Sequence, residues 1–245
     1  MAFISGASRG VGLALVDRLL RTTALTVYAG SRSAPDSNAL RALRDVYGPR
    51  LRPVSLDVTD AKSIAAAAAE MVEPCKLLVH VAAIMHPSGR GENTVRRLDQ
   101  ADMQTVLNTN VVGPALLTGA LYERLREAQP KLGEPAKVVA VGAGVGSVST
   151  NAAGGWYSYR ISKTALNALV KNLAVEGARH FVLAYSLYPE MVDTEFAKPY
   201  VKGNPYPTLR TPNEVAERML DLTGSLGATD SGRFINIWSK EDIPY

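Results

Sequence analysis

The 245-residue chain is 47% hydrophobic and 20% charged, a composition typical of a single globular α/β domain with a sizeable core. Its net charge is only +4 and its basic residues are scattered, which argues against a nucleic-acid partner. No apolar run approaches the roughly 20 residues of a membrane helix, so no membrane partner is expected. We also expect no metal site. Cys75 is the only cysteine, which excludes an internal disulfide and suits a reducing compartment. A strand beginning at residue 2 leaves no room for a signal peptide, so we expect a cytoplasmic protein.

The chain begins with an apolar run at 2–4 and a glycine-rich turn at 5–12, followed by an amphipathic helical segment. Strand, turn and helix in this order place a phosphate at a helix N-terminus, where unpaired N–H groups and the positive end of the dipole meet it. Gly6 permits a sharp turn, Gly10 a close approach to a pyrophosphate, and Gly12 tight packing of helix on strand. The pattern predicts a dinucleotide site, although an ordinary β–α turn with surplus glycine is the alternative.

Predicted strands and helices alternate to the end of the chain. Strands are expected at about 2–5, 24–29, 51–56, 76–82, 136–142, 181–187 and 232–237. Helices are expected at about 10–21, 37–47, 61–72, 98–128, 156–178 and 212–223. Continuous apolar strands such as 77–81 indicate burial on both faces, which favours a single-domain, doubly wound, seven-stranded parallel sheet of the Rossmann type. The irregular stretch at about 195–211 is too long for a plain connection and predicts a substrate loop, the alternative being a surface insertion.

Tyr159 and Lys163 lie four residues apart near the start of the long helix predicted at 156–178, so both occupy one helix face. A free phenol has a pKa of about 10, too high for easy proton exchange at neutral pH. A nearby ammonium favours the phenolate and makes tyrosine a usable acid–base group. Such a pair is common by chance, and it gains weight from lying downstream of the glycine turn.

Over nearly its whole length the chain resembles the short-chain dehydrogenase/reductase family. The elements that occur in family order are Gly6, Gly10 and Gly12, Asp57-Val58, Asn110, Tyr159 and Lys163, and Pro189, Val192 and Thr194. Within the family it is most similar to the small carbonyl reductases typified by sniffer and C-factor proteins. The stretches that carry this likeness are 108–113, 154–167 and the closing 243–245.

The resemblance implies hydride transfer between a nicotinamide cofactor and a carbonyl or alcohol. It makes Tyr159 the proton donor, and Lys163 the group that binds the nicotinamide ribose and depresses the tyrosine pKa. Asn110 would hold a water in the proton relay, and Thr194 the carboxamide. The cofactor residues so implied are Gly6, Ser8, Arg9, Gly10, Val11, Gly12, Arg32, Asp57, Val58, Ala82, Ala83, Asn110, Tyr159, Lys163, Pro189, Val192 and Thr194.

The residues after the second strand bear on the choice of cofactor. An acid there would bind a ribose 2′-hydroxyl and repel a 2′-phosphate, yet none occurs before Asp36. Arg32 follows the strand and Arg9 lies within the glycine turn. Guanidinium groups grip a phosphate with a planar fork, so we expect NADP(H). The alternative is that Arg32 is only a solvated charge.

Three departures from the family pattern stand out. The family's Asn-Asn-Ala-Gly is here residues 80–83, with alanine at Ala83 in place of glycine. The family serine that contacts the substrate oxygen aligns with Ala143, which has no hydroxyl, and Ser147 is the nearest one and the candidate replacement. The family's Pro-Gly is Pro189-Glu190. Glu190 and His86 could supply new acid–base groups, or be a solvated charge and a loop histidine.

We therefore expect an NADP(H)-dependent reductase of a carbonyl, or an imine, in a small hydrophobic molecule. Aromatic residues that hint at such a substrate are Trp156, Tyr157, Phe196, Tyr200 and Tyr206. The alternatives are a non-redox enzyme, catalysing a cyclisation or rearrangement, and a non-catalytic NADP(H)-binding sensor. Apolar residues on several faces of the helices predicted at 98–128 and 156–178, together with the resemblance, predict a homo-oligomer, either a dimer or a tetramer.

Overall fold

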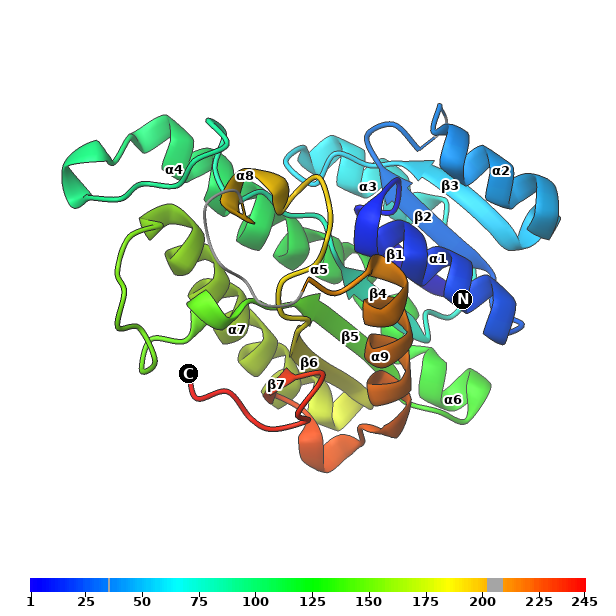
Figure 1. Cartoon of the computed structure of the whole chain (residues 1–245). Helices are drawn as coiled ribbons and strands as arrows, with labels where there is room; N and C mark the ends of the chain where they lie inside the picture. The colour runs from blue at the N-terminus through cyan, green and yellow to red at the C-terminus, as the bar shows by residue number, and fades with distance from the viewer. Residues whose placement is uncertain (35, 202–208) are drawn as a thin grey trace.

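The structure, a computed structural model, describes residues 1–34, 36–201 and 209–245. Part of the predicted loop at 195–211, including Tyr206, lies outside the described residues. The described chain forms a seven-stranded sheet in the order β3-β2-β1-β4-β5-β6-β7 (Figure 1). Every neighbouring pair in it is parallel. The strands are β1 Ala2–Ser5, β2 Val27–Ser31, β3 Leu51–Ser55, β4 Leu77–His80, β5 Ala136–Val141, β6 Val182–Tyr188 and β7 Phe234–Asn236. The predicted fold class is confirmed.

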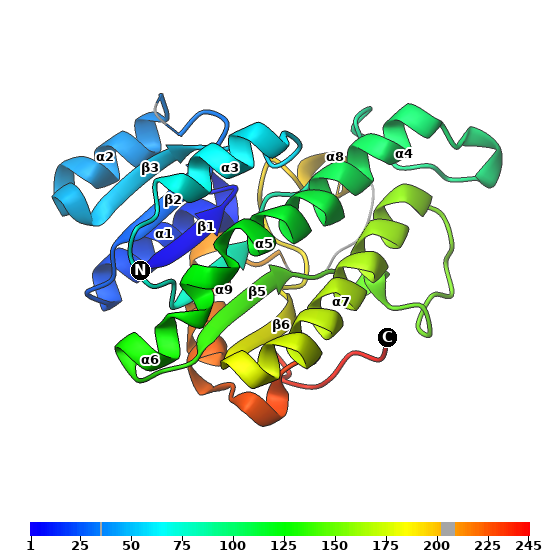
Figure 2. The same cartoon turned by 180° about the vertical axis from the view of Figure 1, so that it is seen from behind.

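Helices cover both faces of the sheet (Figures 1 and 2). On one face lie α1 Gly10–Thr22, α2 Asn38–Tyr47 and α9 Pro212–Ser225, and on the other α3 Ala61–Ala69, α5 Gly113–Arg126 and α7 Tyr157–Gly177. Shorter helices are α4 Gln100–Leu107, α6 Ala128–Leu132 and α8 Lys198–Val201. None of the helices in the described ranges is long and apolar enough to cross a membrane.

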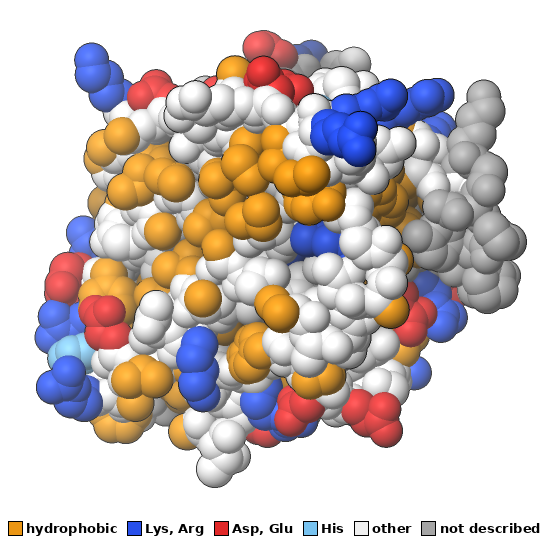
Figure 3. All heavy atoms as spheres, turned by 90° about the vertical axis from the view of Figure 1, so that its left-hand side faces the viewer, with side chains coloured by type: hydrophobic (Ala, Val, Ile, Leu, Met, Phe, Trp, Pro, Cys, Tyr) orange, Lys and Arg blue, Asp and Glu red, His pale blue; other side chains and the backbone are white. Residues whose placement is uncertain are grey.

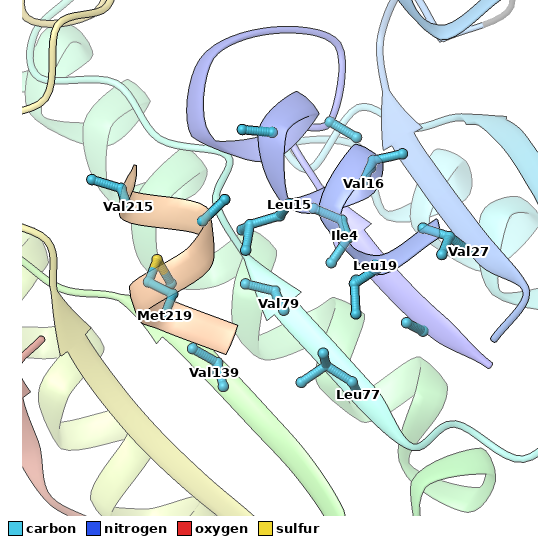
Figure 4. Close-up of a cluster of buried hydrophobic side chains, with 14 of the residues drawn as sticks. Ile4, Leu15, Val16, Leu19, Val27, Leu77, Val79, Val139, Val215 and Met219 are labelled. Atoms are coloured by element: carbon cyan, nitrogen blue, oxygen red, sulfur yellow. The ribbon is translucent and has the colours of Figure 1, made fainter. Parts of the chain in front are cut away.

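Successive side chains on each strand point to opposite faces of the sheet, and they belong to two separate hydrophobic clusters. Ile4 of β1 points into the cluster beneath α1 and α9, whereas the neighbouring Phe3 points into the cluster beneath α3, α5 and α7. Figure 4 shows the first cluster, in which Leu15 and Met219 from the two helices meet the strand residues. Full burial of one such side chain stabilises the fold by about 1.5–3 kcal/mol.

Two of the differences from the sequence prediction bear on the course of the chain. β2 begins at Val27 rather than near residue 24, because Thr23 ends α1 with a hydrogen bond from its hydroxyl to the Leu19 carbonyl. The single helix expected at 98–128 consists of α4, a π-helical turn at Asn108–Val112 and α5. Such wide turns are rare and often lie at functional sites.

The strand order reverses between β1 and β4. Ligands of open parallel sheets bind in the crevice at the carboxyl ends of the strands, where the order reverses. Here the turn after β1 touches the segment after β4, because a Cβ atom on Gly6 would lie 2.7 Å from the backbone nitrogen of Ala82. Ser5 joins the same two segments, since its hydroxyl accepts a hydrogen bond from the Val81 N–H at 3.2 Å. The glycine turn therefore lies where a dinucleotide is expected.

Candidate active site

The three glycines of the turn occupy positions that a side chain would disrupt. Gly6 and Gly10 have φ angles of +72° and +55°, in the left-handed region that favours glycine. A Cβ atom on Gly12 would lie 2.2 Å from the Gly6 carbonyl oxygen, so Gly12 permits α1 to pack on the turn. A Cβ on Gly10 would meet the Thr194 methyl at 3.3 Å. The turn and the segment after β6 thus lie next to each other at the carboxyl edge of the sheet.

The N-terminus of α1 offers an anion site. Arg9 precedes the helix in extended conformation and is exposed, and its side chain does not cap the helix within the described structure. Arg32 is exposed directly after β2, near Asp57. The Thr59 hydroxyl and N–H hold the pKa of Asp57 below its usual value, and the Arg32 guanidinium adds to this effect. The free helix terminus and the two guanidinium groups fit a dinucleotide carrying an additional phosphate.

Tyr159 and Lys163 are both buried, with 7% and 3% of their surfaces exposed. The Lys163 ammonium lies 5.7 Å from the centre of the Tyr159 ring and donates a hydrogen bond to the Val141 carbonyl at 2.8 Å. Burial raises the pKa of Tyr159 and lowers that of Lys163 to about 8. The expected depression of the tyrosine pKa by Lys163 is therefore not found in this structure, because desolvation favours both neutral forms. A protonated phenol is the form that donates a proton.

Asn110 lies in the π-helical turn and ties it to two other elements. Its amide exchanges two hydrogen bonds with the Ile84 backbone, at 2.9 and 2.8 Å, and donates a third to the Ser162 hydroxyl at 3.0 Å. Ser162 donates in turn to the Tyr159 carbonyl at 2.8 Å. Both side-chain amide protons of Asn110 are donated within the protein, to the Ile84 carbonyl and to Ser162. A relay water at Asn110 would therefore be held by an oxygen atom of that residue.

The start of α7 is fixed by a buried carboxylate that the sequence analysis did not single out. Glu92 accepts hydrogen bonds from the N–H and the hydroxyl of Ser158, in the first turn of the helix. A carboxylate there satisfies free N–H groups and meets the positive end of the dipole. The Glu92 carbonyl also accepts the Trp156 N–H, and Trp156 has a left-handed φ of +50°. Glu92 therefore positions the helix that carries Tyr159, a contact that its loop sequence did not reveal.

An apolar cluster surrounds the Tyr159 ring. Buried Met85 and Tyr200 pack with it, together with the partly buried side chains of Ala143, Val145, Trp156 and Phe196. The Tyr159 and Phe196 rings lie 6.4 Å apart, and the Trp156 and Tyr200 rings 5.3 Å apart in an edge-to-face arrangement. Tyr157, one of the aromatic residues that hinted at a hydrophobic substrate, begins α7 and is not part of this cluster of described residues. Ala143, the residue predicted to stand at the position of the family serine, thus contributes a methyl group to this aromatic cluster.

The structure does not place Ser147 as a replacement for that serine. Ser147 is buried, and its hydroxyl donates to the Pro244 carbonyl near the end of the chain. The same oxygen accepts the Thr150 N–H at 3.3 Å. Its only proton is therefore used to hold residues 243–245 against the loop after β5.

Glu190 and His86 are also engaged elsewhere. Glu190 has a left-handed φ of +62°, and its carboxylate pairs with Arg210 at 3.2 Å and accepts from Asn236 at 3.3 Å. His86 binds the Ser88 hydroxyl at 2.8 Å, and its other ring nitrogen lies between the carboxylates of Glu92 and Asp102. Glu190 therefore ties Arg210, near the end of the predicted loop, to the segment that follows β6. The His86 side chain is only 7% exposed although it lies in a loop.

The remaining predicted cofactor residues line the carboxyl edge of the sheet. Ser8 and Val11 flank the glycines, and Ala83 is half-buried after β4. Val58 packs against the end of the π-helical turn, where a Cβ on Gly113 would lie 2.8 Å from it. The other residues at this edge come from the segment after β6, namely Pro189, Val192 and Thr194. The structure thus brings the predicted set to one edge.

His80, which the resemblance aligns with the first asparagine of the family pattern, is buried at the end of β4. Its Nε2 lies 2.8 Å from the Thr118 hydroxyl, which already donates its proton to Pro114. Nε2 must therefore carry the proton and donate to Thr118. Nδ1 has no partner within the described residues, and burial lowers the pKa of His80 to about 3.

We expect His80 to make the fold acid-sensitive. The unfolded chain binds a proton at a pKa of about 6.5, whereas folded His80 resists protonation until a pKa of about 3. Stability from this group is therefore present above pH 6.5 and lost as pH falls toward 3. Between pH 7 and pH 5 the loss amounts to about 2 kcal/mol. Urea unfolding at pH 7 and pH 5 should give a smaller difference in the free energy of unfolding for His80→Gln than for the wild type. An unchanged difference would contradict the neutral state assigned to buried His80.

Fold and site together define a dinucleotide-binding α/β protein with a tyrosine–lysine pair beside the crevice. Residues 1–205 match the family model for short chain dehydrogenases, so the chain belongs to this family of oxidoreductases. It is 32% identical over 180 residues to a 1-hydroxy-2-glutathionyl-2-methyl-3-butene dehydrogenase of Rhodococcus, covering 73% of this chain and 74% of that one.

Two solved structures are similar over the full length of the chain. The NADPH-bound carbonyl reductase from chicken fatty liver is 29% identical, with a TM-score of 0.87, and the match covers 100% of this chain and 98% of that one. The carbonyl reductase Sniffer of Drosophila melanogaster has the same TM-score and coverage at 22% identity, which shows the shared fold.

Proposed function

We propose that the protein is an NADPH-dependent reductase of small hydrophobic carbonyl compounds, with aromatic aldehydes and ketones as the favoured class. The observation that carries this proposal is the buried Tyr159–Lys163 pair, in which the Tyr159 ring also packs within an aromatic cluster. The 29% identical, NADPH-bound carbonyl reductase supports it. Arg9 and Arg32 are the groups that would hold the 2′-phosphate.

Each side chain has a separate part in this reduction. Bound NADPH supplies the hydride that adds to the carbonyl carbon. The Tyr159 hydroxyl donates the proton that the carbonyl oxygen needs, so that an alcohol and NADP⁺ are the products. Lys163 would bind the nicotinamide ribose and stabilise the phenolate left on Tyr159. Asn110 would hold a water that returns a proton, and Thr194 the carboxamide.

The test is NADPH oxidation with a panel of carbonyl compounds, followed by identification of the products. We expect 4-nitrobenzaldehyde and 2,2,2-trifluoroacetophenone to be reduced to alcohols, and the polar dihydroxyacetone to react poorly. Tight NADPH binding without reduction of any carbonyl or imine would contradict the proposal. Isomerised or cyclised products would instead favour a non-redox enzyme. NADPH binding without any product would favour a non-catalytic sensor.

We also propose that the chain forms a homo-oligomer through α5 and α7. Leu116 and Val112 near the start of α5, and Ile161 and Val175 on α7, are exposed hydrophobic residues. Figure 3 shows hydrophobic side chains gathered on the side of the molecule that carries α4 and α7. Sedimentation equilibrium would distinguish a dimer or tetramer from a monomer.

A cytoplasmic location stays a prediction, to be checked by cell fractionation.

A further inference from the structure

Tyr188, the last residue of β6, faces the catalytic helix. Side chains two residues apart on a strand share a face, so Tyr188 lies on the face that carries Ser186. Ser186 is bonded to Asn167 of α7 at 2.7 Å. Because α7 runs from the carboxyl edge of the sheet back across it, Lys163 and Tyr159 lie one and two turns nearer that edge than Asn167 does. Tyr188, the next residue on this face toward the same edge, therefore lies level with them.

The phenol of Tyr188 lies against the turn that follows the missing serine. A Cβ atom on Gly144 would lie 3.2 Å from Cζ and 3.4 Å from Oη of Tyr188, so the ring packs closely against the backbone of Gly144. Gly144 follows Ala143 directly. The turn itself is fixed on α7, because a Cβ on Gly146 would lie 2.9 Å from Cβ of Lys163. The Tyr188 hydroxyl is thus next to the strand end where the family pattern places its substrate-binding serine.

The electrostatic coupling agrees with this geometry. After burial, the groups that raise the pKa of Tyr159 are the phenols of Tyr200 and Tyr188. Tyr200 lies on the short helix α8, and its ring packs edge-to-face on Trp156. Tyr188 instead lies at the end of β6, which pairs with β5 and β7, and it adjoins the position of the lost hydroxyl.

We propose that the Tyr188 hydroxyl donates a hydrogen bond to the substrate's carbonyl oxygen, in place of the serine that is absent at Ala143. The hydroxyl keeps its proton, while Tyr159 gives up the one that is transferred. This inference rests on the proposed carbonyl reduction. A donor aimed at the oxygen stabilises the charge that develops there during hydride addition.

Tyr188→Phe keeps the ring against Gly144 and removes only the hydroxyl. We expect kcat for 4-nitrobenzaldehyde to fall about a hundredfold, the usual effect of losing one such donor, with NADPH affinity unchanged. Adding Ala143→Ser to this variant should restore at least a tenth of the lost activity. Tyr185→Phe is the matched control, because its hydroxyl bonds to the Gly227 carbonyl on the other face of the sheet.

A second readout avoids turnover. 2,2,2-Trifluoro-1-phenylethanol is a poor hydride donor with an acidic hydroxyl, and its affinity for the NADP⁺ complex can be measured by calorimetry. We expect Tyr188→Phe to weaken it about tenfold and Tyr185→Phe to leave it unchanged. If the wild type reduces carbonyls and Tyr188→Phe is unaffected, this inference is overturned while the proposed function stands. The same holds if Ser147→Ala loses carbonyl reduction and Tyr188→Phe retains it. A wild type that reduces no carbonyl overturns the proposed function and this inference with it.

Discussion

Tyr159→Phe is expected to reduce carbonyl turnover at least a thousandfold while leaving the fold and NADPH affinity intact. Phenylalanine keeps the ring that packs on Met85 and Phe196 and removes only the transferable proton. Burial raises the pKa of this phenol, so the proton is in place at neutral pH before the reaction begins. Single-turnover kinetics with NADPH and 4-nitrobenzaldehyde would isolate the chemical step, and thermal unfolding would check the fold.

Tyr157→Phe is the comparison variant, because Tyr157 is a second phenol only two residues away. Its partner four residues on is Ile161 rather than a lysine, so its hydroxyl has no equivalent of Lys163. Near wild-type turnover in Tyr159→Phe, or a dead Tyr157→Phe beside an active Tyr159→Phe, would show that the reaction does not use the predicted proton donor.

The fold was predictable because local pattern and tertiary packing agree. Apolar runs such as 77–81 are buried on both faces, and the strands they predicted form a parallel sheet. The π-helical turn was not predictable, because the segment has continuous helical periodicity. The turn coincides with tertiary hydrogen bonds of Asn110 to Ile84, which lies 26 residues away.

The candidate site was predictable where a sequence motif fixes the backbone. It was not predictable where a residue's role depends on the direction of its side chain. The glycines lie at left-handed or crowded positions, which is why their spacing carried information. Ser147 was the nearest hydroxyl in sequence, yet its proton goes to Pro244, 97 residues away. Tyr188 escaped notice because the strand was expected to end at 187 and the motif to begin at Pro189. Which phenol faces the candidate site depends on how β6 packs against α7, and the local sequence does not reveal this packing.

Arg32→Ala is expected to weaken NADPH binding by about 10- to 150-fold, the effect of losing one charge-assisted hydrogen bond of about 1.5–3 kcal/mol. NADH affinity should change little, because that cofactor lacks the 2′-phosphate. Calorimetric titration of both cofactors would measure the two effects. Arg18→Ala is the matched control, since Arg18 lies on α1 and pairs with Glu217.

Arg32→Asp tests the same site more severely and separates it from a general charge effect. A carboxylate at the end of β2 accepts hydrogen bonds from the ribose hydroxyls and repels a 2′-phosphate. The variant should therefore lose NADPH affinity further than Arg32→Ala does, and gain affinity for NADH. If both cofactors weaken equally, Arg32 acts only through the net charge of the crevice. If neither weakens, it is a solvated surface residue, and Arg9 with the N-terminus of α1 must hold the phosphate alone.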